Sequence, residues 1–155
     1  MHQIPELDRE LPNTIAYLRG ELEGLGCGLS SPMEGSLCAF FAFGAGKTIA
    51  FRADMDALPI AEKTGAPYAS NHPGKMHACG HDGHMAILLE LARRLSKRTQ
   101  FHHNILLVFQ PAEEASGGAK EICDSGIFAT YNTEVIFGLH LWPGLPTGKI
   151  FSKPG

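Results

Sequence analysis

The alternation of apolar and polar positions divides the chain into helical and extended segments. In residues 5–24 apolar side chains recur at helical spacing, and the run ends at Gly24, which can adopt the left-handed conformation that terminates helices. The same spacing recurs from residue 83 to about residue 98, where basic side chains occupy the last turns and interact favourably with the helix dipole. We therefore predict two helices, each packing one face on a core.

Four shorter apolar runs predict strands. Residues 36–43 and 47–53 flank a short glycine-containing link and are typical of a β-hairpin, so we expect the sheet to begin with an antiparallel pair. Residues 104–109 and 134–139 are continuous apolar runs, as in central strands covered on both faces, and residues 116–130 between them form a plausible helix. This order predicts a parallel pair joined by a right-handed crossover.

These elements predict an α/β fold, in which helices flank a mixed, mostly parallel sheet in three layers. Such sheets bind ligands at the carboxyl ends of their strands, because the loops there gather over one edge. The segments 52–56, 110–114 and 138–143 each end or follow a predicted strand and carry polar side chains. We expect all three to reach one pocket together with the segment 76–84.

Composition narrows the class of protein. With 155 residues, 44% of them hydrophobic and 19% charged, and a formal net charge of −3, the chain can form one domain with a core. Neither disorder nor a nucleic-acid surface is indicated. No apolar run approaches the ~20 residues that span a bilayer, and residues 1–6 lack the features of a signal peptide, so we expect a cytoplasmic protein without a membrane partner. In a reducing compartment Cys27, Cys38 and Cys123 are expected to be small core residues.

The segment 76–84 holds one thiol, three imidazoles and a carboxylate. Within it Cys79 and His81 lie one residue apart, so a thiolate and an imidazole could chelate one ion or two adjacent ions. A carboxylate pair and a distant histidine after other strands strengthen this indication, because adjacent glutamates would otherwise repel each other at a buried strand end. One glutamate could bind metal while the other takes a proton from water, and spacing does not decide which.

In their order along the chain, four motifs resemble the amidohydrolase family of dinuclear metallopeptidases, which includes N-acyl-amino-acid amidohydrolases, hippurate hydrolases and auxin-conjugate hydrolases. The resemblance extends over nearly the whole chain. The motifs are Arg52-Ala53-Asp54-Met55-Asp56-Ala57-Leu58-Pro59, Met76-His77-Ala78-Cys79-Gly80-His81-Asp82-Gly83-His84, Gln110-Pro111-Ala112-Glu113-Glu114 and Gly138-Leu139-His140-Leu141-Trp142-Pro143.

The resemblance implies that Cys79, His81, Glu114 and His140 are metal ligands and that Glu113 is the general base. It implies two divalent ions, with Mn or Zn first and Co or Ni as options. The implied reaction is hydrolysis of the amide of a small N-acyl amino acid, and the family resemblance further implies a homodimer for a full-length member.

Four other residues in the motifs are candidates for supporting roles. Asp54 resembles a carboxylate that does not bind the metal itself but orients a metal ligand and raises its basicity. Asp82 could orient the His81 imidazole or cap the following helix, and Asp56 is expected to form or support a turn. His84 could support a ligand, contact substrate or only satisfy backbone groups at a helix start.

Family members have a longer chain with a lid or dimerisation domain and a further histidine ligand. We therefore expect residues 1–147 to be the N-terminal part of the catalytic domain, and residues 148–155 to start the connection to a lid that this chain lacks. An alternative is a catalytically incomplete fragment that only binds metal or a partner chain. A third interpretation is a cysteine hydrolase with Cys79 as nucleophile and His81 as base, although it leaves the glutamates without a role.

Overall fold

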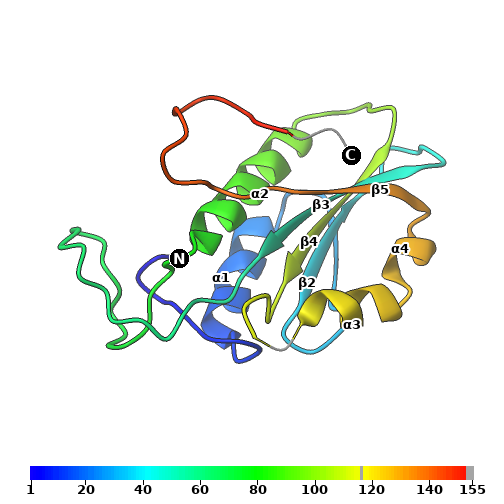
Figure 1. The fold of residues 1–155 in the computed structure, drawn as a ribbon. Helices are drawn as coiled ribbons and strands as arrows, with labels where there is room; N and C mark the ends of the chain where they lie inside the picture. The colour runs from blue at the N-terminus through cyan, green and yellow to red at the C-terminus, as the bar shows by residue number, and fades with distance from the viewer. Residues whose placement is uncertain (116, 153–155) are drawn as a thin grey trace.

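The computed structural model describes residues 1–115 and 117–152. A five-stranded sheet lies between two layers of helices (Figure 1). In chain order the elements are α1 (Pro12–Leu22), β1 (Gly28–Ser30), β2 (Leu37–Phe41), β3 (Thr48–Asp54), α2 (His81–Leu95), β4 (Asn104–Gln110), α3 (Gly118–Asp124), α4 (Ile127–Thr130) and β5 (Thr133–Gly138). The prediction of a mixed α/β sheet flanked by helices is confirmed.

The strands are arranged in the order β1-β2-β4-β3-β5. β3 is parallel to both β4 and β5, whereas β2 is antiparallel to β1 and to β4. The predicted hairpin of residues 36–43 and 47–53 is therefore wrong, because β4 lies between β2 and β3. Glycines in a short link permit a tight turn, but they do not force the flanking strands to pair.

A second correction concerns the predicted pair of β4 and β5. The two strands run in the same direction, but the crossover through α3 and α4 passes over β3, so they are not neighbours. β5 lies at the edge of the sheet, and Val135, Ile136 and Phe137 are 38%, 47% and 48% exposed. It is therefore not the covered central strand that its apolar run predicted, whereas β4 is buried along nearly its whole length.

The first helix begins at Pro12, later than the predicted residue 5. Proline suits the first helical turn because the N–H it lacks would have no partner there. The side chain of Glu6 accepts hydrogen bonds from the backbone N–H groups of Asn13 and Thr14 at 3.1 and 2.8 Å. A carboxylate at a helix N-terminus satisfies free donors and interacts favourably with the dipole, so Glu6 caps the helix from outside it.

Two apolar clusters cover the two faces of the sheet. On one face α1 and α2 pack against side chains of β2, β3 and β4, with Leu18, Met85 and Phe109 fully buried. On the other face α3 and α4 contribute Ile122 and Ile127. Cys123 is exposed, which contradicts the prediction that it is a core residue, whereas Cys38 is buried as expected. Among the described residues no helix is long and apolar enough to cross a bilayer.

Candidate metal centre

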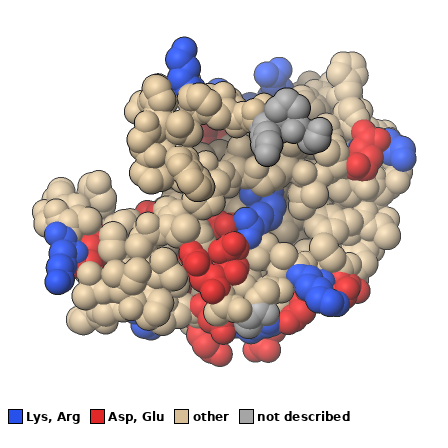
Figure 2. Space-filling view, in the orientation of Figure 1, with Lys and Arg blue, Asp and Glu red and all other residues tan. Residues whose placement is uncertain are grey.

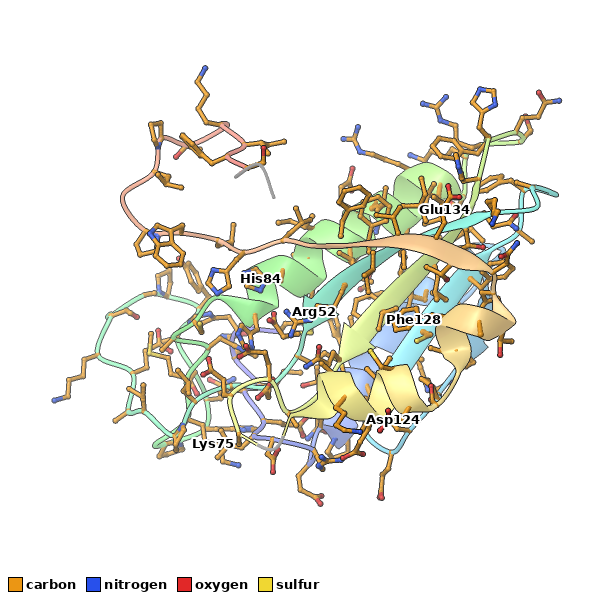
Figure 3. The ribbon with its side chains drawn as sticks, turned by 45° about the vertical axis from the view of Figure 1, so that its right-hand side comes forward. Arg52, Lys75, His84, Asp124, Phe128 and Glu134 are labelled. Carbon is orange, nitrogen blue, oxygen red and sulfur yellow. The ribbon has the colours of Figure 1, made fainter. Side chains whose placement is uncertain are left out.

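The proposed ligands gather at one edge of the sheet. Because β3, β4 and β5 are parallel, their carboxyl ends at Asp54, Gln110 and Gly138 lie at the same edge, as predicted. Helix α2 begins there too, at His81, and Figure 3 shows His84 of α2 and Arg52 of β3 in this region. Acidic side chains gather in the middle of the face seen in Figure 2.

The imidazole of His81 is oriented by the main chain. Its Nδ1 lies 2.7 Å from the carbonyl oxygen of Asp56, and a carbonyl only accepts, so Nδ1 carries the proton. The opposite nitrogen, Nε2, therefore has a free lone pair. This atom is buried and has no hydrogen-bond partner among the described residues, and it lies 3.7 Å from carboxylate oxygens of Asp54 and Glu114. A buried acceptor without a donor is costly unless a further group completes it.

His140 has the same arrangement on the other side of the site. Its Nδ1 donates to the carbonyl oxygen of Leu141 at 2.7 Å, which leaves Nε2 unprotonated, 3.6 Å from Sγ of Cys79. Metal-ligating histidines commonly donate their second ring N–H to a carbonyl in this manner, because the bond fixes both tautomer and orientation.

These donor atoms fit a divalent cation. In the part of the chain that the structure describes, three overlapping groups have ligand atoms within 4.8 Å of one another, and His81 belongs to each of them. The groups are Cys79, His81 and His140; Asp54, His81 and His84; and His81, Glu113 and Glu114. Sulfur, imidazole nitrogen and carboxylate oxygen together suit Zn, Mn, Co or Ni.

The two glutamates are held by a residue that the sequence analysis treated as a turn former. The carboxylate of Asp56 accepts the backbone N–H groups of Glu113 and Glu114, each at 3.0 Å. With its carbonyl bound to His81, Asp56 organises three of the candidate residues at once. An aspartate directly after a buried strand was the only available sequence signal, and it does not reveal such long-range partners.

Asp54 is buried at the end of β3 and keeps a negative charge. Its Oδ1 accepts from His84 Nδ1 at 2.6 Å, and its Oδ2 accepts from the guanidinium of Arg52 at 2.7 Å. Burial alone would raise the pKa of Asp54, but the hydrogen bond from His84 and the positive charge of the Arg52 guanidinium lower it. The ionised carboxylate lies close enough to His81 to support or to share a cation there.

Asp82 lies apart from the other candidates. Its Oδ2 is 2.7 Å from Nδ1 of His2, and the structure shows the main chain of Asp56, not Asp82, as the partner that orients His81. His77 is buried, and neither of its ring nitrogens has a hydrogen-bond partner among the described residues. The segment 76–84 thus contributes Cys79 and His81 to the candidate metal centre and Asp82 to a contact with the N-terminus.

The environment of Cys79 argues against a nucleophilic role. Burial, followed by the hydrogen bond and negative charge of Glu114 and the charges of Glu113 and Asp54, raises the pKa of this thiol to about 11. Nucleophilic cysteines have a lowered pKa, because the thiolate attacks. Surrounding carboxylates instead favour a cation, and a metal ion would deprotonate the thiol on binding.

A hollow of about 640 Å³ adjoins Cys79 and His140. Its wall is formed by the segment that follows β5, including Leu141, Trp142 and Ile150, together with Ile87 of α2. Most of this lining is apolar, so the hollow could receive an apolar part of a ligand beside the candidate metal centre.

The sequence is similar to a known protein family and to individual proteins. Residues 50–155 match the model of peptidase family M20/M25/M40. An N-acetyldiaminopimelate deacetylase of Listeria monocytogenes is 44% identical over 161 residues, which cover 100% of this chain and 42% of that protein. An uncharacterized hydrolase of Staphylococcus epidermidis is 40% identical, with 97% of this chain and 40% of that protein covered.

Solved structures give the same result. Bacillus subtilis YxeP, a dinuclear metal binding peptidase from the M20 family, superimposes with a TM-score of 0.93 at 37% identity, covering 99% of this chain and 44% of YxeP. A glutaminyl cyclase of Bacteroides thetaiotaomicron, with a TM-score of 0.62 and 19% identity over 88% of this chain and 56% of its own, shares the fold. The chain thus spans about two fifths of the length of the curated relatives that it matches.

Proposed function

The chain belongs to peptidase family M20/M25/M40, and from this premise we propose that it builds the metal centre of an amidohydrolase that cleaves N-acyl amino acids. The observation that carries this proposal is the pair of imidazoles, His81 and His140. Each donates Nδ1–H to a backbone carbonyl and presents an unprotonated Nε2 to a thiol or carboxylate neighbour. Few arrangements other than a metal site require two such lone pairs beside anionic ligands.

In this proposal Cys79, His81, Glu114 and His140 hold two divalent ions, with Mn or Zn the first choice. YxeP, named as dinuclear, and the overlapping donor groups support that number. When bound, such ions would polarise a water molecule and the carbonyl of the scissile amide.

Glu113 would take the proton of the attacking water and return it to the leaving amine. The position of Glu113 supports this role. The residue is exposed, whereas its backbone N–H is held by the carboxylate of Asp56 at an N···O distance of 3.0 Å. An accessible carboxylate on a fixed backbone can reach a water molecule and a substrate nitrogen in turn.

The substrate class rests on the relatives and on the hollow beside the site. The Listeria relative is named an N-acetyldiaminopimelate deacetylase, and we extend from that name to N-acyl amino acids as the substrate class of this chain. We further propose that residues 1–147 form the N-terminal part of the catalytic domain and that residues 148–155, of which 153–155 lie outside the described residues, start the connection to a lid domain.

Elemental analysis of the purified chain, in wild type and in two variants, tests the metal centre. We expect two ions per chain, and loss of metal in Cys79→Ala and Glu114→Ala. Cys123→Ala and Glu90→Ala are matched controls, because both residues are exposed and lie outside the candidate ligand groups. A folded wild-type chain without metal would contradict the proposal.

Amine release from N-acetyl amino acids, with and without chelator, tests the reaction. Chelator-sensitive turnover supports the hydrolase. Two bound ions without any turnover would favour the alternative, a metal-binding fragment that is catalytically incomplete.

A further inference from the structure

Both ring nitrogens of His84 are occupied by hydrogen bonds within the chain. Nδ1 lies 2.6 Å from Oδ1 of Asp54, and Nε2 accepts the backbone N–H of Leu141 at 2.9 Å. Because an N–H only donates, Nε2 carries no proton, and Nδ1–H donates to the carboxylate. His84 is therefore neutral and has no lone pair left for a cation, although it lies within 4.8 Å of Asp54 and His81.

The bond to Leu141 connects two elements that are distant in sequence. His84 lies in the first turns of α2, whereas Leu141 belongs to the segment after β5, directly after His140. The carbonyl of the same Leu141 accepts Nδ1–H of His140 at 2.7 Å. Leu141 is thus held through its N–H and itself holds the His140 ring through its carbonyl.

Packing adds to this connection. The Leu141 side chain lies against the start of α2, where a Cβ on Gly83 would come within 2.4 Å of its Cδ1 and a Cβ on Gly80 within 3.7 Å. The rings of His84 and His140 contact each other, with centroids 4.7 Å apart. Glycines at these positions therefore leave room for Leu141 to dock.

The hydrogen bonds on the Asp54 side of His84 are fixed to the sheet. Arg52 donates to Asp54 at 2.7 Å and, through Nε, to the side-chain oxygen of Gln110 at 2.8 Å. The Asp54 carboxylate that holds His84 is thereby tied to the ends of both β3 and β4. A continuous series of hydrogen bonds leads from the centre of the sheet to His140 on its edge.

We propose that His84 is a positioning residue for His140: it holds the Leu141 main chain against α2, so that the Leu141 carbonyl orients the His140 imidazole toward Cys79. The inference rests on the proposed function, since it assigns His84 a part in building the same metal centre. Such a support is needed because His140 follows an exposed edge strand, whereas His81 begins a buried helix.

Two substitutions separate the two bonds of His84. In His84→Asn the side-chain NH2 can replace Nδ1–H and keep the bond to Asp54, but it loses the acceptor for Leu141. In His84→Gln the carbonyl oxygen can take the place of Nε2 and keep the bond to Leu141. We expect Co²⁺ affinity, followed by visible absorption of the purified chain, to fall about tenfold in His84→Asn. In His84→Gln it should remain within about threefold of wild type.

A double-mutant cycle shows whether the effect passes through His140. His140→Ala removes the ring, so adding His84→Asn should cost no further Co²⁺ affinity if His84 acts only by positioning it. Additive losses would overturn the proposal, and so would equal losses in folded His84→Asn and His84→Gln. If His84→Asn does not fold, His84→Gln decides, because a tenfold loss in that folded variant contradicts the proposal.

Amide hydrogen exchange of the metal-free chain gives a readout independent of metal. The Leu141 amide should exchange on the order of tenfold faster in His84→Asn than in wild type and in His84→Gln. Unchanged exchange in His84→Asn would overturn the positioning role. A wild-type chain that binds no Co²⁺ would count against the proposed function alone, because Leu141 exchange still decides the inference.

Discussion

The carboxylate oxygen Oδ2 of Asp56 accepts the backbone N–H of Glu114 at 3.0 Å, across 58 residues of sequence. Oδ1 accepts from the next residue back, Glu113, so one side chain fixes the turn that carries both glutamates. Ala112, just before them, has a positive φ of 56°, a costly conformation for a residue other than glycine. Asp56 therefore stabilises a turn that the local sequence does not favour.

Asp56→Asn should disrupt this turn. The asparagine amide has one oxygen to accept from the two N–H groups and places its own NH2 against the second one, so one partly buried N–H loses its partner. We expect the free energy of unfolding to fall by about 1–3 kcal/mol and Co²⁺ affinity to fall because Glu114 moves. Urea denaturation measures the first effect. Asp124→Asn, in an exposed pair with Lys120, serves as a control worth at most about 0.5 kcal/mol. Equal stabilities of the two variants would contradict this role.

The assignment of one glutamate as ligand and the other as base can be tested by matched substitutions. Glu113→Gln keeps the shape but removes the proton acceptor, so metal content should stay at the wild-type value while turnover falls about 10²–10⁴-fold. Glu114→Gln should lose metal. Elemental analysis and amine release from N-acetyl amino acids measure the two effects. The reverse result, with metal lost only in Glu113→Gln, would exchange the two roles.

The raised pKa of Cys79 predicts a slowly reacting thiol in the metal-free chain. In the metal-free chain the thiol is protonated at neutral pH, because its pKa is about 11, and alkylation by iodoacetamide should be slow. The exposed Cys123 provides an internal comparison and should react at least as fast. Peptide mass analysis over time distinguishes the two sites. Preferential alkylation of Cys79 in the metal-free chain would revive its interpretation as a nucleophile.

Sequence reasoning succeeded where a pattern was local and failed where it depended on strand order. The helical spacing from Met85 onward and the buried run at Leu106 correctly located α2 and β4, since periodicity reflects burial directly. The supposed hairpin failed because pairing is set by tertiary contacts. The placement of polar clusters at strand ends was confirmed, since it follows from parallel strand direction alone.

The candidate site, too, could be predicted from the sequence only in part. The residue types at Cys79, His81 and His140 were readable from sequence, because few roles other than chelation need them together. The contacts of Asp56 with Glu113 and of His84 with Leu141 were not, since each joins residues that lie 57 positions apart in sequence. A residue that holds another residue's main chain has no signature in its own neighbourhood.

His2 links the N-terminus to the start of α2 in a pH-dependent manner. Its ring lies 2.7 Å from Asp82 and 3.2 Å from Glu62. Burial alone would lower the pKa of His2, but the hydrogen bonds and charges of Asp82 and Glu62 raise it above 6.5. A raised folded-state pKa means that the stabilisation is fully present below pH 6.5 and is lost as pH rises through the folded-state value.

We therefore expect the N-terminal segment to loosen above that pH. Amide exchange of residues 2–6 should accelerate between neutral and mildly alkaline pH in wild type, beyond the intrinsic base catalysis seen in a matched peptide. His2→Gln should show the loosened state at all pH values. An NMR titration of the His2 ring that gives a pKa below 6.5 would contradict the prediction.

The exposed edge of the sheet predicts self-association of the purified chain. Within residues 1–115 and 117–152 β5 pairs with β3 alone, and its outer side offers backbone N–H and C=O groups without a strand partner beside Val135, Ile136 and Phe137, each more than one third exposed. Glu134 near the start of β5 is a charged residue, but the following stretch of the exposed edge is apolar and can pair with a second edge. We expect a concentration-dependent shift to larger species in sedimentation velocity. Ile136→Lys should reduce it, because association would bring a charged side chain into the contact, whereas Ile87→Lys on the exposed face of α2 should not. Equal association in both variants would show that β5 is not the contact.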